Sequence, residues 1–181
     1  MKTVSKIVES DQKIIQKAQR TGRSSAIILH YLDAMAEKLG KIAAFTNKTI
    51  AIEILTPNVA LTVKYSQPID LKVVGIQTKN GNLSLGFMDT GNGTVYASAK
   101  IPAETFKNKS KIVYSFLFQN DALFQTEDQI KNQLSSKVLA VSFGKEKIRN
   151  LTLPIQLIFK KIKKIKTVDN VCVFWAPAIC K

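Results

Sequence analysis

The residue types that most often carry out catalysis or bind metals are scarce in this 181-residue chain. It contains one histidine, His30, and two cysteines, Cys172 and Cys180. A hydrolytic triad needs a nucleophile held by a base, and the serines nearest to His30 do not share a reliable helix face with it. Two cysteines and one histidine do not complete a four-ligand zinc site, and no phosphate-binding glycine loop with its lysine is present. We therefore expect no enzyme activity, no metal and no cofactor, and we expect His30 to be an ordinary helix residue.

Acceptor motifs for N-linked glycans are more frequent than chance predicts. Asn-x-Ser/Thr begins at five asparagines: Asn47, Asn82, Asn92, Asn108 and Asn150. Ten asparagines and 25 serines and threonines would give about one or two such motifs by chance. Because secreted proteins carry bulky glycans at such sites, the excess favours extracellular exposure. The same tripeptides also suit turns and strand starts, so the alternative stays open.

The chain is strongly basic, with a formal net charge of +14. One cluster, "KKIKKIK", holds five lysines: Lys160, Lys161, Lys163, Lys164 and Lys166. A basic patch of this kind can bind acidic glycans or nucleic acid, and it can equally protect an edge strand from pairing with other chains. Nucleic acid is the weaker candidate, because aromatic and basic residues are not interleaved as base stacking requires.

The first 45 residues show the periodicity of helices. Over 24–45, apolar residues recur three and four positions apart and form one predicted face: Ile27, Leu29, Leu32, Met35, Ala36 and Leu39. Ser24 or Ser25 is a suitable N-cap. Upstream, a looser helix is expected from another apolar set: Val4, Ile7, Val8, Ile14, Ile15 and Ala18.

From residue 46 the pattern changes to short β-branched runs separated by turn residues. The expected strands lie within 49–55, 59–65, 69–76, 83–88, 94–101, 111–119, 136–144, 153–165 and 171–175, with a short helix or loop in 120–134. Short strands that are not separated by long helices indicate an antiparallel β-sandwich. We therefore predict a mainly β fold, with a helical segment over 1–45 followed by a sandwich over 46–181.

In this order, the motifs of the C-terminal half resemble the GAIN domain of adhesion G-protein-coupled receptors, leading into its proteolysis-site (GPS) motif. The motifs are Val138–Ser142, Leu151–Ile162 with Pro154 and Phe159 in step, and Cys172-Val173-Phe174-Trp175. The resemblance covers roughly residues 25–175. It implies that 1–45 is a remnant of GAIN subdomain A and that 46–181 is subdomain B with a partial GPS motif.

The chain departs from the family pattern at the cleavage site. The family's tripeptide, His-Leu-Thr or His-Leu-Ser, does not occur in the sequence, and "APAICK" follows Trp175. The resemblance therefore implies a non-catalytic GAIN-type domain or fragment, truncated before the cleavage site. Cys172 and Cys180 could bridge each other, since eight residues separate them, or each could lack a partner that the motif supplies further on.

The implied role is structural: the domain would support or shield the receptor's tethered agonist and relay adhesion signals. The implied partners are the C-terminal fragment and the seven-helix region of the receptor, together with an extracellular ligand or glycan. The implied location is the extracellular face of the plasma membrane. The chain itself shows neither a signal peptide nor a membrane-spanning segment, and an intracellular orphan domain is the alternative that this leaves.

Overall fold

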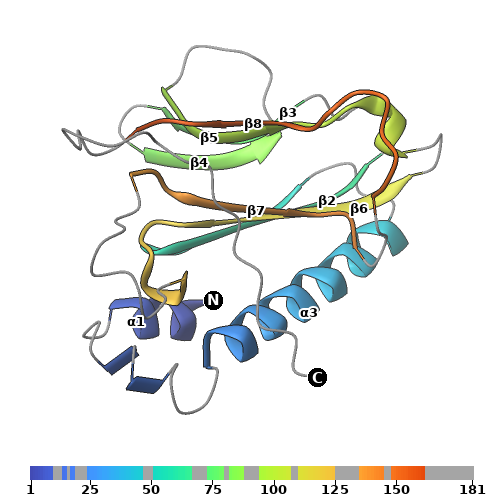
Figure 1. The fold of residues 1–181 in the computed structure, drawn as a ribbon. Helices are drawn as coiled ribbons and strands as arrows, with labels where there is room; N and C mark the ends of the chain where they lie inside the picture. The colour runs from blue at the N-terminus through green and yellow to red at the C-terminus, as the bar shows by residue number, and fades with distance from the viewer. Residues whose placement is uncertain are drawn as a thin grey trace.

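The described helices and strands are stacked as three layers, one of helices and two of four-stranded sheets, in the computed structural model (Figure 1). The structure describes residues 1–9, 14–15, 17–18, 24–46, 51–66, 73–79, 82–87, 94–106, 110–124, 135–144 and 148–161. The helices form the bottom layer in this view, and one sheet lies between them and the other sheet. Every strand pairing in the described residues is antiparallel. The predicted antiparallel β-sandwich with a helical N-terminal part is confirmed.

The helical layer consists of α1, Lys2–Glu9, and α3, Ser24–Phe45. The bounds of α3 agree with the predicted helix over 24–45. Its buried stripe follows the three- and four-residue spacing of Leu32, Ala36, Gly40 and Ala43. Ile27 was predicted on this face, and that prediction is wrong: its side chain is 52% exposed. Five residues before Leu32, it lies on the far side of a helix with 3.6 residues per turn.

The upstream helix also buries only part of its predicted apolar set. Val8 and Ile15 are in the core, whereas Ile7 and Ile14 are exposed. Side-chain bonds tie α1 to the turn between the first two strands. Asn58 donates from Nδ2 to Glu9 Oε1 at 2.8 Å and to the carbonyl of Ser5 at 3.3 Å.

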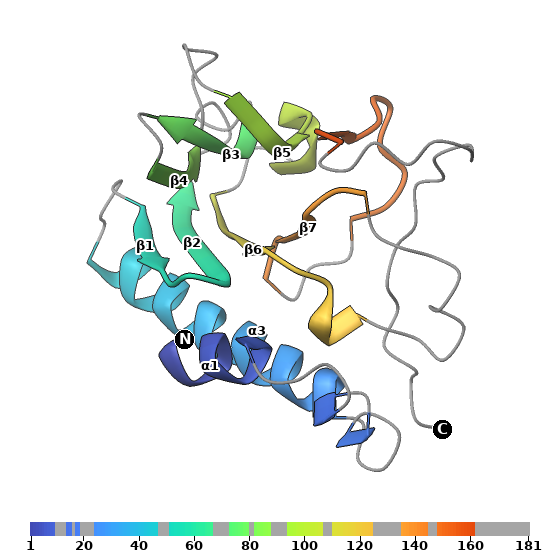
Figure 2. The ribbon, with the colours of Figure 1, turned by 90° about the vertical axis from the view of Figure 1, so that its left-hand side faces the viewer.

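The middle layer, here called the helix-side sheet, has the strand order β1-β2-β6-β7. Its strands are β1, Ile52–Leu55; β2, Val59–Ser66; β6, Lys111–Phe118; and β7, Val138–Ser142. The central pair, β2 and β6, is in register from Val59 opposite Phe118 to Ser66 opposite Lys111. Figure 2 shows this sheet edge on, with β1 and β7 at its two ends.

The other layer, here called the outer sheet, has the order β4-β3-β5-β8. Its strands are β3, Val73–Lys79; β4, Asn82–Phe87; β5, Thr94–Lys100; and β8, Gln156–Phe159. Two short 3-10 helices flank β6 in the chain: η1, Ala103–Phe106, and η2, Ala122–Phe124. A short helix or a loop was expected in 120–134, and η2 lies in the described part of that segment.

The helix-side sheet is buried on both faces. Alternate residues of its central strands pack against the helices: Val59, Leu61, Val63, Tyr114, Phe116 and Phe118. The residues between them face the outer sheet, where Ala60 and Leu117 pack with Ala97, and Val113 packs with Phe106 and Ala99. The helices and the sandwich therefore share the strands of one sheet, and the division of the chain at residue 45 stays a prediction.

Candidate functional site

β8, the last of the described strands in the sequence, lies at one end of the outer sheet as far as the structure describes it. It pairs with β5 from Ala97 opposite Phe159 to Lys100 opposite Gln156, and among the described strands β5 is its only partner. β7 likewise lies at one end of the described part of the helix-side sheet, and it is next to β5 across the sandwich. The ends of both sheets therefore lie on the same side of the molecule, as Figures 1 and 2 show.

A loop of irregular backbone over 148–155 leads into β8 and is anchored at several points. Ile148 and Ile155 pack against the Phe106 cluster between the sheets. The backbone N–H of Leu153 donates to Glu104 Oε1 at 2.6 Å, so η1 holds the middle of the loop. β8 lies within the run 153–165 where a strand was expected, and it begins at Gln156, two residues after Pro154. Proline has no N–H to donate to a strand partner, so the strand pairing begins only after it.

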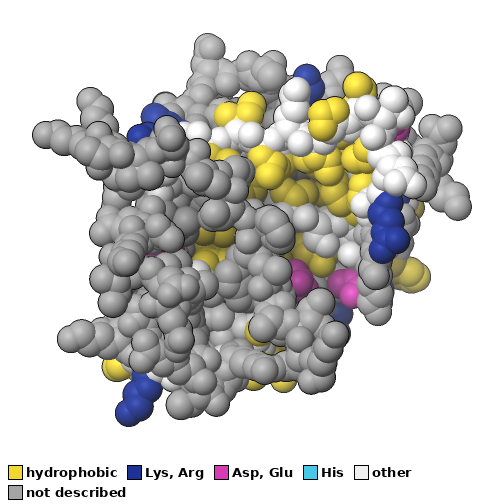
Figure 3. Space-filling view, viewed as in Figure 1, with side chains coloured by type: hydrophobic (Ala, Val, Ile, Leu, Met, Phe, Trp, Pro, Cys, Tyr) yellow, Lys and Arg dark blue, Asp and Glu magenta, His cyan; other side chains and the backbone are white. Residues whose placement is uncertain are grey.

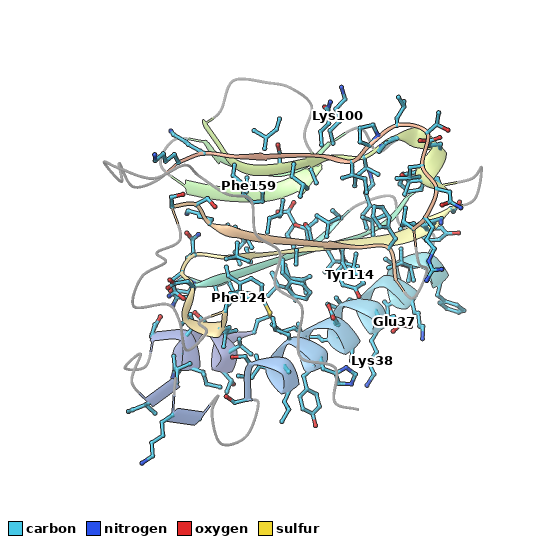
Figure 4. All side chains as sticks on the ribbon, viewed as in Figure 1. Glu37, Lys38, Lys100, Tyr114, Phe124 and Phe159 are labelled. Atoms are coloured by element: carbon cyan, nitrogen blue, oxygen red, sulfur yellow. The ribbon has the colours of Figure 1, made fainter. Side chains whose placement is uncertain are left out.

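Large apolar side chains are exposed along β8 and its loop. Leu153, Leu157 and Ile158 are 61%, 53% and 58% exposed. Figure 3 shows hydrophobic side chains gathered on this face, in the upper right over the region of β7 and β8. Phe159, by contrast, packs against Ala97 and Leu117 inside the sandwich (Figure 4). An edge strand with exposed apolar side chains is a surface to which another extended segment can bind.

The Tyr114 hydroxyl interacts with the other edge strand, β7, and with the acidic side chains of the helical layer. Tyr114 of β6 lies opposite Ser142 of β7 and forms a side-chain hydrogen bond with it. Burial raises the pKa of the Tyr114 hydroxyl, the bond to Ser142 opposes this, and the carboxylates of Asp33 and Glu37 on α3 raise it further. Figure 4 shows Tyr114 on the side of the sheet that faces Glu37.

The two acidic residues of α3, Asp33 and Glu37, each interact with other residues of the same helix. Burial raises the pKa of the Asp33 carboxyl, and the nearby His30 lowers it in part. Glu37 pairs with Lys41 one turn later, at 3.2 Å. His30 is exposed, and its ring centre is 6.3 Å from that of Tyr31.

The buried polar contact at Tyr114 was not predicted, since nothing in the sequence pairs residues of β6, β7 and α3.

Four of the predicted site residues have described side chains. Pro154 is exposed in the loop before β8, and Lys160 and Lys161 are exposed directly after it. Asn150 is exposed in the same loop, with a backbone φ of 54°. Asn82 is the first residue of β4, but its side chain is not described. The other predicted residues lie outside the described residues: Asn47, Asn92, Asn108, Lys163, Lys164, Lys166, Cys172, Phe174, Trp175 and Cys180.

Within the described ranges, no group of three or more His, Cys, Asp or Glu residues could hold a metal ion. No helix in those ranges is long and apolar enough to cross a membrane.

The larger part of this chain matches the model of a known protein family. The model of the GPS family, described as GAIN subdomain B, matches residues 58–179, about two thirds of the chain. The chain therefore belongs to this family.

A solved structure with the same fold is the full extracellular region of zebrafish Gpr126/Adgrg6, with a TM-score of 0.59 and 20% sequence identity. The match covers 71% of this chain and 19% of that one, so the chain spans about a fifth of the length of that protein. The fold is that of a GAIN domain in the extracellular region of an adhesion G-protein-coupled receptor.

Proposed function

We propose that this chain is a non-catalytic GAIN domain that holds and shields a tethered activating strand at its β8 edge, on the extracellular face of the plasma membrane. In this role it relays adhesion signals to the seven-helix part of a receptor. The observation that carries the proposal is the edge position of β8 among the described strands, together with the exposure of Leu157 and Ile158.

An edge strand supplies both the affinity and the specificity that this role needs. Its outward N–H and C=O groups can bond an added strand, and its side chains offer an apolar surface for alternate residues of that strand. A strand bound in this way is withheld from the receptor, and signalling then depends on how firmly the edge retains it.

The inner side of β8 connects this edge to the rest of the domain. Phe159 packs on Leu117 of β6, and β6 also packs against α3 through its other face. A load applied to the helical layer therefore acts on the sheet that supports β8.

Basal signalling of a chimeric receptor tests the proposal. Residues 1–181 replace the corresponding domain of an adhesion receptor whose signalling can be measured in cells. Leu157→Lys and Ile158→Lys should raise basal signalling, because a buried unpaired charge weakens strand docking. Phe45→Lys is the matched control, since Phe45 is 92% exposed on α3, away from β8. If all three variants signal like the parent chimera at equal surface expression, the proposal is wrong.

The absence of self-cleavage is a part of the proposal with its own test. The sequence contains neither His-Leu-Thr nor His-Leu-Ser, and its single histidine precedes Tyr31. The purified protein should keep its intact mass during prolonged incubation at neutral pH. A specific internal scission in the presence of protease inhibitors would contradict this part, and its loss in a His30→Ala variant would identify His30 as the base.

A second candidate function is binding of acidic glycans, favoured by the exposure of Lys160 and Lys161 directly after β8 and by the net charge of +14. Affinity for heparin should fall steeply with salt, and a Lys160→Gln, Lys161→Gln variant should elute earlier than wild type. Lys38→Gln, Lys41→Gln on α3 removes the same charge elsewhere and should elute later than the first variant. Equal elution of the two double variants would exclude Lys160 and Lys161 as the contact.

A further inference from the structure

We infer that Asn150 carries an N-linked glycan, placed on the loop that leads into β8. This inference rests on the proposed extracellular location, because only the secretory pathway supplies the donor. Asn150 begins the acceptor motif Asn150-Leu151-Thr152, and the side chains of both Asn150 and Thr152 are exposed. The glycan and the residue that its transfer requires therefore both find room on the folded surface.

The backbone at Asn150 has a left-handed conformation, with a φ of 54°. Asparagine and aspartate adopt this conformation more readily than other residues with a side chain. The residue is thus suited to its loop for a conformational reason as well, and a test must separate the two roles.

The loop around Asn150 is anchored so that this residue stays on the surface. Ile148 and Ile155 pack between the sheets, and Leu153 is held by Glu104. Asn150 and its neighbour Arg149 are exposed between these anchors. A bulky, hydrophilic chain at Asn150 displaces no core side chain, which is the condition that a folded protein sets on a glycan.

The chemistry is a transfer from a lipid-diphosphate-linked oligosaccharide, catalysed by the transferase of the secretory pathway. The Asn150 amide nitrogen, Nδ2, attacks the anomeric carbon of the donor sugar, and a C–N bond forms. The bond from that carbon to the diphosphate oxygen breaks, the amide loses one proton, and the lipid diphosphate leaves. No residue of this chain acts as the catalyst.

Site occupancy measured on the secreted protein tests the inference. The full chain is fused to a secretion leader and expressed in eukaryotic cells, and an amidase that converts a glycosylated asparagine to aspartate is applied before peptide mass spectrometry. We expect conversion at Asn150 in wild type and in Thr152→Ser, which keeps the motif. We expect none in Thr152→Ala, and no glycan in Asn150→Asp, which keeps a residue that tolerates the left-handed backbone.

Unconverted Asn150 in secreted wild-type protein would overturn the inference. If other acceptor sites are converted in that sample, the chain has passed through the secretory pathway and the proposed extracellular function is unaffected. Conversion at Asn150 in Thr152→Ala would also overturn it, because the modification would not then be the motif-dependent transfer. Equal melting temperatures of Asn150→Asp and wild type, both treated with the amidase so that they carry the same residues, verify that loss of the glycan has not been confused with misfolding.

Discussion

The crossing of α3 over β6 allows one stability prediction to be worked out in detail. Gly40 lies in the buried stripe of α3, and a Cβ added to it would lie 2.1 Å from Cγ2 of Ile112, with Cβ and Cδ1 of the same residue at 3.2 and 3.3 Å. Ile112 is branched at Cβ and therefore stiff, so its methyl group cannot simply rotate away. The helix and the strand must move apart to accept Gly40→Ala.

Two effects of opposite sign decide the size of this change. Replacing glycine by alanine inside a helix stabilises a protein by about 1 kcal/mol, whereas overpacking a core typically lowers the free energy of unfolding by about 1–3 kcal/mol. The short Cγ2 distance places Gly40→Ala at the upper end of that range. We therefore expect a net loss of about 1–2 kcal/mol in the free energy of unfolding.

A double-mutant cycle isolates the contact. Ile112→Ala removes Cγ2, so in that background Gly40→Ala should stabilise the protein by its helix propensity, about 1 kcal/mol. Urea denaturation of the four proteins gives the coupling energy, expected at about 2–3 kcal/mol. Ala34→Gly, on the opposite side of α3, measures the propensity term in the same helix. A coupling energy below about 0.5 kcal/mol would refute the reasoning.

Three further predictions concern other parts of the fold. Phe118→Ala should cost about 3–5 kcal/mol, because Phe118 is fully buried, whereas Phe45→Ala should change stability by less than about 0.5 kcal/mol; thermal unfolding distinguishes them, and similar losses would contradict the packing. Burial raises the pKa of the Asp33 carboxyl, so the folded state binds the proton more tightly than the unfolded chain. This tighter binding stabilises the folded state at low pH, and the stabilisation is lost as the pH rises through the pKa of the folded state. Asp33→Asn should therefore stabilise the protein more at about pH 7 than at about pH 3.5 in urea titrations, and the reverse order would refute the assigned direction. In the isolated domain, Ile158→Lys should reduce the self-association measured by light scattering without lowering the melting temperature, because Ile158 is exposed on an edge strand. Unchanged self-association would show that it does not occur through β8.

Local patterns in the sequence predicted the elements more successfully than their faces. The three- and four-residue spacing over 24–45 predicted α3 with its bounds, since that periodicity is a property of one helix. The side of α3 that is buried depends on a sheet formed from distant residues, and Ile27 was therefore assigned to the wrong face. A strand was expected within 153–165, and Pro154 accounts for the start of β8 as late as Gln156, because proline cannot donate to a strand partner.

The candidate site divides in the same way. The exposed Asn150 and Lys160 belong to motifs that are contiguous in the chain, and these motifs were visible in the sequence. The contact of Tyr114 with Ser142 joins residues 28 positions apart in two strands, and only the register of β6 with β7 creates it. Strand order is a long-range property, and the position of β8 beside β5 could not be predicted from either segment alone.

Because both faces of β6 are buried in the folded protein, this strand is a site of aggregation in the unfolded chain. Its segment 111–118, "KIVYSFLF", has high β-propensity, contains no proline or glycine, and carries one charge, at Lys111. Its neighbours in the sheet, β2 and β7, lie far away in the sequence, and its two faces are covered by separate layers. A newly made, truncated or damaged copy therefore presents an adhesive strand on both sides, which is the pattern of segments that stack into amyloid-like fibrils. We expect chaperones to bind at this segment, and proteins that lose either covering layer to aggregate through it.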